Sequence, residues 1–168
     1  MCEGKTEKLY FGGMRQCVRR VSQLTVKEPG EDHLSLVRRA AEIRTAEYDE
    51  VWCVLDTELN DELVAKLRTE AERLDVNLAL SAPSFEFWLI LHLRDCSRPF
   101  QSAREAEKQL RAILPSWSKT ATRFDDFESG VADACKRARR LHDGDGWPPN
   151  PSSGVWRLVE NIRRVPGE

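Results

Sequence analysis

Apolar residues along the first hundred positions follow two patterns, one typical of helices and one of buried strands. They recur at helical spacing in segments 6–21, 34–41 and 61–74. Between the last two lies a short, almost wholly apolar run, 51–55, rich in β-branched and aromatic residues, which predicts a buried strand. A second extended run, 76–80, follows the third helical segment. Strand, helix and strand in this order predict a right-handed parallel crossover.

The second half of the chain has a pattern that predicts helices. Segment 85–93 is apolar nearly all round, which indicates a buried helix with Ser84 as its N-cap. Three amphipathic helices are expected at residues 103–113, 127–141 and 155–162. In the first half of the chain, one more short strand is expected near 24–26, between the first two helical segments. We therefore expect a single domain over 1–168 with an α/β fold, in which a mostly parallel sheet flanked by helices (1–95) carries an appended helical part (96–168).

Composition narrows the class of protein without indicating its function. The 168 residues are 40% hydrophobic and 32% charged, which is ordinary for a soluble globular chain. A formal net charge of −2 gives no general electrostatic attraction to nucleic acid. No apolar run approaches the length that crosses a membrane and the N-terminus is polar, so we expect a cytoplasmic protein without membrane contact. Scattered cysteines without a CxxC pair argue against disulfides and zinc.

The first candidate for chemistry lies where the strand at 51–55 ends. Asp56 and Glu58 follow it directly, one residue apart. In open α/β sheets, ligands collect at the carboxyl ends of the strands. Side chains two apart on an extended segment point the same way, so both carboxylates could bind one hard cation or share one proton transfer. The alternative is structural, because an Asp at a strand end often caps the next helix.

Three motifs resemble one known family. They are CEGKTE at 2–7, VLDTE at 54–58 and SAPSFEFWLILH at 81–92. Together they resemble the RloB family of prokaryotic defence proteins, whose N-terminal part is similar to the TOPRIM catalytic fold. The third motif is the most specific, since packing alone would rarely produce this string. Segments 117–119 and 149–153 also resemble family positions, so the similarity covers nearly the whole chain.

The resemblance implies that Glu3, Asp56 and Glu58 converge on a divalent cation, Mg²⁺ or Mn²⁺, in a TOPRIM-like sheet. TOPRIM enzymes act on phosphodiester bonds, with the glutamate in proton transfer and the paired acids holding the metal. Carboxylate oxygens are the ligands that Mg²⁺ prefers, so the residue types agree with this role. Gly4 would let the backbone approach a phosphate, and Lys5 would contact that phosphate as a point charge.

Other polar residues in these motifs have two possible roles each. Glu86, near a helix start, would serve as a further ligand or base, or would be stabilised there by the helix dipole. His92 lies on a different face of that helix and is more typical of a core histidine. Lys119 and Arg123 would reach nucleic acid or be exposed linker charge. The expected site is catalytic at Glu3, Asp56, Glu58 and Glu86, metal-binding at Glu3, Asp56 and Glu58, and substrate-binding at Lys5, Lys119 and Arg123.

The leading functional hypothesis is a metal-dependent nuclease that cleaves RNA or DNA. The resemblance adds an effector role in an antiphage defence system and an ATPase partner. A second hypothesis is a catalytically weak binding module that regulates the ATPase, because the family normally has an apolar strand before Cys-Glu-Gly and this sequence starts at Met1. Glu58 also stands where TOPRIM proteins more often have Asp. A third hypothesis is another phosphoryl-transfer activity, such as processing a nucleotide signal.

Overall fold

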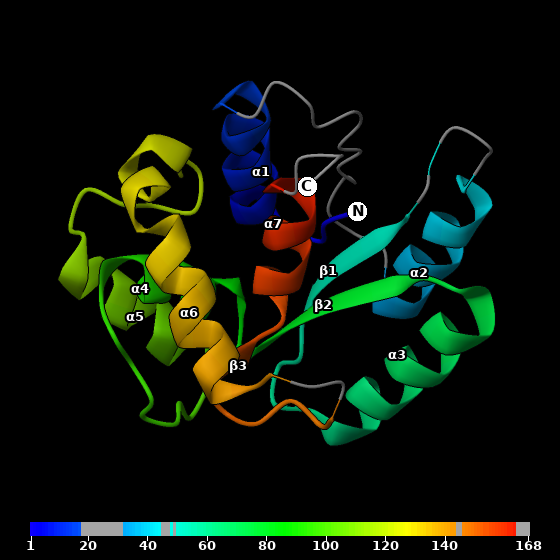
Figure 1. The fold of residues 1–168 in the computed structure, drawn as a ribbon. Coiled ribbons are helices and arrows are strands. Elements are labelled where there is room, and N and C mark those ends of the chain that lie inside the picture. The colour runs from blue at the N-terminus through cyan, green and yellow to red at the C-terminus, as the bar shows by residue number, and fades with distance from the viewer. Residues whose placement is uncertain (18–31, 45–47, 49, 144–145, 164–168) are drawn as a thin grey trace.

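The computed structural model describes residues 1–17, 32–44, 48, 50–143 and 146–163 (Figure 1). Seven helices and three strands are assigned within these residues. They are α1 (Lys5–Cys17), α2 (His33–Glu42), β1 (Trp52–Asp56), α3 (Asp61–Leu74), β2 (Asn77–Ala82), α4 (Phe85–Leu93), α5 (Ala103–Ile113), α6 (Val131–Leu141), β3 (Ser152–Ser153) and α7 (Val155–Arg163). Two short 3-10 turns, Phe124–Asp126 and Glu128–Gly130, precede α6. The strand expected at 24–26 and the end of the first predicted helix lie outside the described residues.

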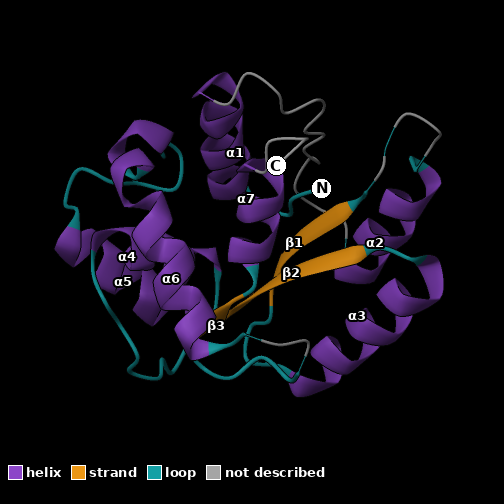
Figure 2. Cartoon of the chain, in the orientation of Figure 1, coloured by secondary structure: helices purple, strands orange, loops and turns teal. Residues whose placement is uncertain are grey.

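The sheet has the order β1-β2-β3 (Figure 2). β1 and β2 are parallel, with Asp56 opposite Ser81, which confirms the parallel pairing predicted for the strand, helix, strand unit. β3 pairs antiparallel with the end of β2 and places Ser153 opposite Ser81. On the other side of β1, Cys2 forms a single parallel bridge with Val54. The backbone just before Glu3 is thereby fixed beside β1.

Helices cover both faces of this sheet, and the two faces bury different residues. α2 and α3 lie on one side, while α1 and α4 to α7 lie on the other (Figure 1). Along β1, Cys53 and Leu55 pack into the cluster that includes α2 and α3, whereas Val54 packs into the cluster that includes α1 and α4. This alternation follows from the two-residue period of a strand. It explains why the run reads as continuously apolar, since both faces are covered.

The helix α4 forms the centre of the larger core. Its residues from Phe85 to His92 are all buried, which confirms the buried helix predicted for this segment. Trp88 and Phe87 are fully enclosed, among the side chains of α1, α5 and α6. Each aromatic side chain of this size contributes about 1.5 to 3 kcal/mol when it leaves water. The position of α4 is therefore strongly fixed, and so is the start of the helix at Phe85.

The prediction of a mostly parallel, TOPRIM-like sheet is wrong. The described part of the chain is mostly helical (58%) and carries only a small mixed sheet of three strands. Two apolar runs form β1 and β2, but the third strand consists of two serines and runs antiparallel. A parallel strand needs a long apolar run that can be buried on both faces, and the rest of the apolar sequence has helical spacing instead. Among the described helices, none is both long and apolar enough to cross a membrane.

Candidate active site

Asp56 ends β1 and points its carboxylate at the start of α4. Its Oδ1 accepts a hydrogen bond of 2.8 Å from the backbone N–H of Phe85, the first residue of that helix. The following helix α3 is capped instead by Asn60, whose side chain accepts from the N–H of Leu63 at 3.0 Å. Asp56 is therefore a helix cap, but of a helix distant in sequence rather than of the next one. This bond fixes the carboxylate at the carboxyl edge of β1 and β2.

Glu58 does not continue the extended direction of Asp56. The strand ends at Asp56, and both Glu58 (φ 49°) and Leu59 (φ 55°) adopt the left-handed conformation. The N–H of Glu58 donates to the carbonyl of Pro83 at 3.2 Å, so the turn is tied to the segment after β2. The expectation that two residues of one strand present both carboxylates side by side therefore fails at this turn. The two acids belong to neighbouring but different groups of side chains.

Glu58 lies with Glu3 and His33, and these three form the first group. One ligand atom from each lies within 4.8 Å of the others. Glu3 Oε2 is 3.0 Å from His33 Nε2, and neither side chain is fully exposed, at 31% and 14% respectively. The contact with Glu3 is the main cause that raises the pKa of His33, and the charge of Glu58 adds to it. This group combines two carboxylates and one imidazole.

Asp56, Glu7 and Glu86 form the second, more deeply buried group. Glu7 in α1 is 4% exposed and Glu86 in α4 is 3% exposed. Burial, followed by the charges of Glu86 and Glu3, raises the pKa of Glu7 to about 7. Asp56 is half-buried as a residue, yet burial of its carboxyl is the largest cause that raises its pKa well above the usual range, followed by the charges of Glu7 and Glu86. Neighbouring carboxylates whose negative charge is not fully balanced by nearby positive charge keep their protons to higher pH than usual.

Gly4 makes room for the Glu7 carboxylate. A Cβ atom at position 4 would lie only 2.6 Å from Glu7 Oε2, which is closer than a side-chain contact permits. The sequence had suggested that this glycine lets the backbone approach a phosphate. In the structure, the space that a larger residue would fill is occupied by a carboxylate of the protein itself. Gly4 thus helps to bring Glu7 next to the Glu3 segment.

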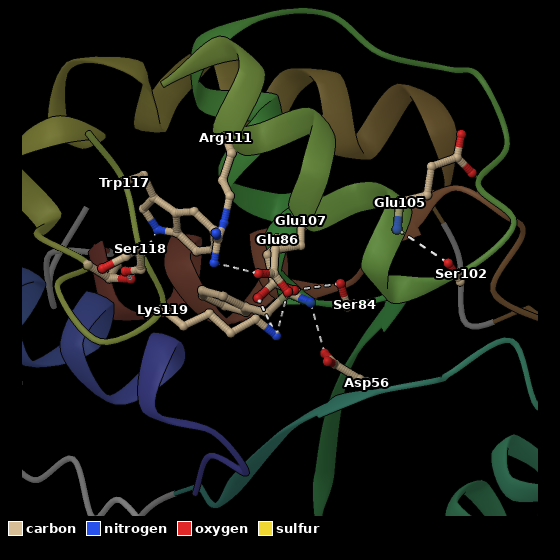
Figure 3. A network of polar contacts seen from close by, with 12 residues as sticks. Asp56, Ser84, Glu86, Ser102, Glu105, Glu107, Arg111, Trp117, Ser118 and Lys119 are labelled. Atoms are coloured by element: carbon tan, nitrogen blue, oxygen red, sulfur yellow. Dashed lines mark hydrogen bonds and ion pairs between the residues drawn. The ribbon is translucent and has the colours of Figure 1, made fainter. Parts of the chain in front are cut away.

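Ser84 and Lys119 each contact one carboxylate oxygen of the buried Glu86 (Figure 3). Ser84 Oγ donates a hydrogen bond of 2.6 Å to Glu86 Oε2. Lys119 Nζ lies 3.3 Å from Glu86 Oε1 and 3.3 Å from Glu107 Oε2, so it bridges α4 and α5. Burial alone would lower the pKa of Lys119, but Glu86 and Glu107 outweigh it and raise that pKa. The lysine, half exposed, links the buried acids to the surface.

The sequence comparison decides the family of the chain. A family model described as RloB-like protein matches residues 1–162. The chain belongs to the RloB-like protein family. No curated protein and no solved structure matches it. The family predicted from the three motifs is therefore confirmed.

The remaining predicted site residues of this RloB-like protein lie apart from the two groups or have other partners. Lys5 is exposed at the start of α1. Arg123 Nη2 contacts Asp126 Oδ1 at 2.8 Å, three residues along the same segment. His92 is a core residue, as its sequence context indicated, because its ring nitrogens meet the Tyr10 hydroxyl at 2.9 Å and a backbone carbonyl. Burial lowers the pKa of His92 to about 4.

Two residues of the candidate site are not predicted by the sequence motifs. Glu7 belongs to the CEGKTE motif, and its position four residues after Glu3 was the available signal. His33 had no comparable signal in the sequence, because it lies near no motif. Its place beside Glu3 results from the packing of α2 against β1, a contact between distant parts of the chain.

Proposed function

We propose that this RloB-like protein is a divalent-metal-dependent phosphodiesterase that cleaves RNA or DNA. The observation that carries the proposal is the convergence of five carboxylates from four segments at one edge of the sheet, with two of them almost fully buried. They are Glu3, Glu7, Asp56, Glu58 and Glu86. Burying like charges together reduces stability, and clusters of this kind are characteristic of functional sites.

The donor atoms fit a divalent cation. Glu3 and Glu58 supply carboxylate oxygens within 4.8 Å of each other, and the charge of Glu3 also acts on Asp56. Carboxylates are suitable ligands for Mg²⁺ and Mn²⁺. A bound cation would supply positive charge against the phosphate oxygens and favour ionisation of a water molecule.

The buried acids suit proton transfer. A group is most effective as a general acid or base when its pKa is near the working pH, and the pKa of Glu7 is about 7. Glu7 is therefore our candidate for giving a proton to the leaving oxygen. Asp56 is held in place by the Phe85 N–H, and Glu86 by Ser84. Lys119 contacts Glu86 and is exposed enough to contact a phosphate of the substrate as well.

The family resemblance is what supports the biological setting that we propose. We include in the proposal that the protein acts in the cytoplasm as the effector of an antiphage defence system and works with an ATPase partner. A second candidate function is a binding module that regulates this partner without cleaving nucleic acid. The ion pairs of Glu86 with Lys119 and of Glu3 with His33 favour it, because they already give two of the acids a counter-charge.

A cleavage assay separates these functions. Purified protein is incubated with tRNA, plasmid DNA and single-stranded DNA in Mg²⁺, in Mn²⁺ and in EDTA. We expect metal-dependent cleavage that falls at least about 100-fold in Asp56→Asn and in Glu7→Gln, which is the usual contribution of a proton-transfer group. Glu62→Gln, an exposed acid paired with Lys66, is the matched control and should cleave normally.

The possible results point to different conclusions. Cleavage that is unchanged in both Asp56→Asn and Glu7→Gln would refute the proposed site. Absence of cleavage on every substrate with both metals would favour the regulatory binding module. Hydrolysis of a nucleotide but not of a polynucleotide would instead indicate another phosphoryl-transfer activity.

A further inference from the structure

We propose that His33 is a metal ligand, and that with Glu3 and Glu58 it forms a site that prefers Mn²⁺ to Mg²⁺. The inference deepens the proposed function, on which it rests for the presence of a metal. It adds a nitrogen ligand to a site for which the sequence suggested oxygen ligands alone. It also narrows the expected ion, which was Mg²⁺ or Mn²⁺, to Mn²⁺.

The spacing of the three side chains agrees with one shared ion. Two neighbouring ligands of an octahedral ion with bonds of about 2.1 Å lie about 3.0 Å apart, and opposite ligands about 4.2 Å apart. Glu3 Oε2 and His33 Nε2 are 3.0 Å apart. The ligand atoms of all three residues, Glu58 included, lie within 4.8 Å of one another. A metal ion can therefore be accommodated with small side-chain adjustments.

Each ligand is attached to a well-anchored backbone. His33 is the first residue of α2, and the Asp32 side chain caps this helix by accepting from the Ser35 N–H at 3.0 Å. The same helix is fixed to the core by Leu36 and Val37, which are 1% and 0% exposed. An imidazole on such a support is preorganised, which is what a metal site requires.

The two glutamates are anchored on the other side of the site. Glu3 follows the bridge between Cys2 and Val54, so its backbone is held beside β1. Glu58 is held by the hydrogen bond of its N–H to the Pro83 carbonyl. The three ligands thus come from three segments that separate interactions fix in place.

The imidazole determines which metal the site prefers. Mg²⁺ is a hard ion that takes oxygen ligands and keeps several waters. Imidazole nitrogen suits first-row transition metals, and affinity for nitrogen and oxygen donors rises from Mn²⁺ towards Cu²⁺. Two carboxylates and one imidazole therefore favour Mn²⁺, or a later ion of that series, over Mg²⁺. A site with carboxylates alone would lack this discrimination.

The test measures metal binding to the full chain without any nucleic acid. Metal-free protein is titrated with Mn²⁺ and with Mg²⁺ by calorimetry, and pulsed electron paramagnetic resonance of the Mn²⁺ complex detects a coordinated imidazole nitrogen. We expect Mn²⁺ to bind at least about tenfold more tightly than Mg²⁺, with a nitrogen signal. His33→Gln should lose that signal and about tenfold or more of the Mn²⁺ affinity, while its Mg²⁺ affinity changes little. His142→Gln, which changes a histidine lining a different pocket, should match the wild type.

Several results would overturn the inference. These are a Mn²⁺ complex of the wild type without nitrogen coupling, a signal that persists in His33→Gln, equal affinity for the two ions, and no binding of Mn²⁺ at all. A wild-type spectrum without nitrogen coupling overturns the inference even if His33→Gln fails to fold. Since no substrate is present, the outcome does not depend on cleavage. A chain that binds Mn²⁺ through His33 but cuts nothing would refute the nuclease and leave the site intact.

Discussion

Replacing Glu7 by Gln should stabilise the metal-free protein at pH 8. The Glu7 carboxyl is buried, and its pKa is raised from 4.5 to about 7, first by burial and then by the charges of Glu86 and Glu3. A folded state with a raised acid pKa keeps its proton to higher pH than the unfolded chain does. Ionisation of Glu7 therefore does not lower the free energy of unfolding below pH 4.5. It lowers this free energy increasingly between pH 4.5 and 7, and by the full amount above pH 7.

The size of the effect follows from this interval. The difference between 4.5 and about 7, at about 1.4 kcal/mol per pH unit, corresponds to about 3 kcal/mol. Gln has nearly the same shape as Glu but no charge to desolvate, so the variant should recover up to this amount at pH 8. For a chain of this size, about 3 kcal/mol shifts the melting temperature by about 6 to 12 °C. At pH 4.5 the variant and the wild type should be nearly equal.

The assay is urea and thermal unfolding in EDTA at pH 4.5, 6 and 8. Glu62→Gln serves as the control, because Glu62 is exposed and paired with Lys66, so that its removal should give no gain in stability at pH 8. Addition of Mn²⁺ should stabilise the wild type at pH 8, since the cation supplies the positive charge that the carboxylates lack. A Glu7→Gln variant that is destabilised equally at pH 4.5 and pH 8 would refute the idea that charge repulsion in the buried group opposes folding.

Three further predictions concern neighbouring residues. Asp56→Asn keeps an acceptor for the Phe85 N–H and should stabilise the metal-free protein at pH 8, whereas Asp56→Ala loses the cap and should be less stable than Asp56→Asn by about 1 kcal/mol in urea unfolding. The pKa of His92 is lowered to about 4, so the contribution of its neutral ring to the free energy of unfolding is complete above pH 6.5. This contribution should fall by about 3 kcal/mol towards pH 4. Urea unfolding of His92→Gln and of the wild type at pH 7 and at pH 4 tests this. Gly4→Ala should displace the Glu7 carboxylate. The cleavage rate should therefore fall clearly in the nuclease assay, while the melting temperature changes little.

The elements that the sequence predicted correctly are those whose burial is visible locally. β1 is an apolar segment whose three central residues are buried, and α4 is buried from Phe85 to His92. β3 could not be found in this way, because Ser152 and Ser153 carry no periodic pattern. Their strand conformation depends on pairing with the end of β2, which is distant in the sequence. The extent of the parallel sheet was overestimated, because the pairing of strands is decided by tertiary contacts that a local sequence pattern does not show.

The candidate site likewise combines residues that the local sequence identifies with residues that only tertiary contacts bring together. Asp56 and Glu86 were found because each follows a recognisable element boundary in a motif. The grouping of the acids was not predictable, because it depends on the left-handed turn at Glu58, which turns this residue away from the line of the strand. His33 enters the site only through the packing of α2 beside β1. Local pattern thus identifies candidate residues, while the backbone path decides which of them share a site.

The two groups of acids differ in a way that bears on the proposed chemistry. Glu3, His33 and Glu58 are partly open to solvent, so a hydrated cation can reach them without unfolding any element. Asp56, Glu7 and Glu86 lie deeper, and burial is the largest cause that raises the pKa of Glu7 to about 7 and the pKa of Asp56 well above its usual range. Environments that separate the protonation of neighbouring acids also separate their roles in catalysis. In the proposed mechanism, a cation held at the open group would lower the pKa of Glu7 and Asp56. Metal binding would then favour release of the Glu7 proton to the leaving oxygen, and the charge of Glu3, which raises the pKa of both acids, would link the two events.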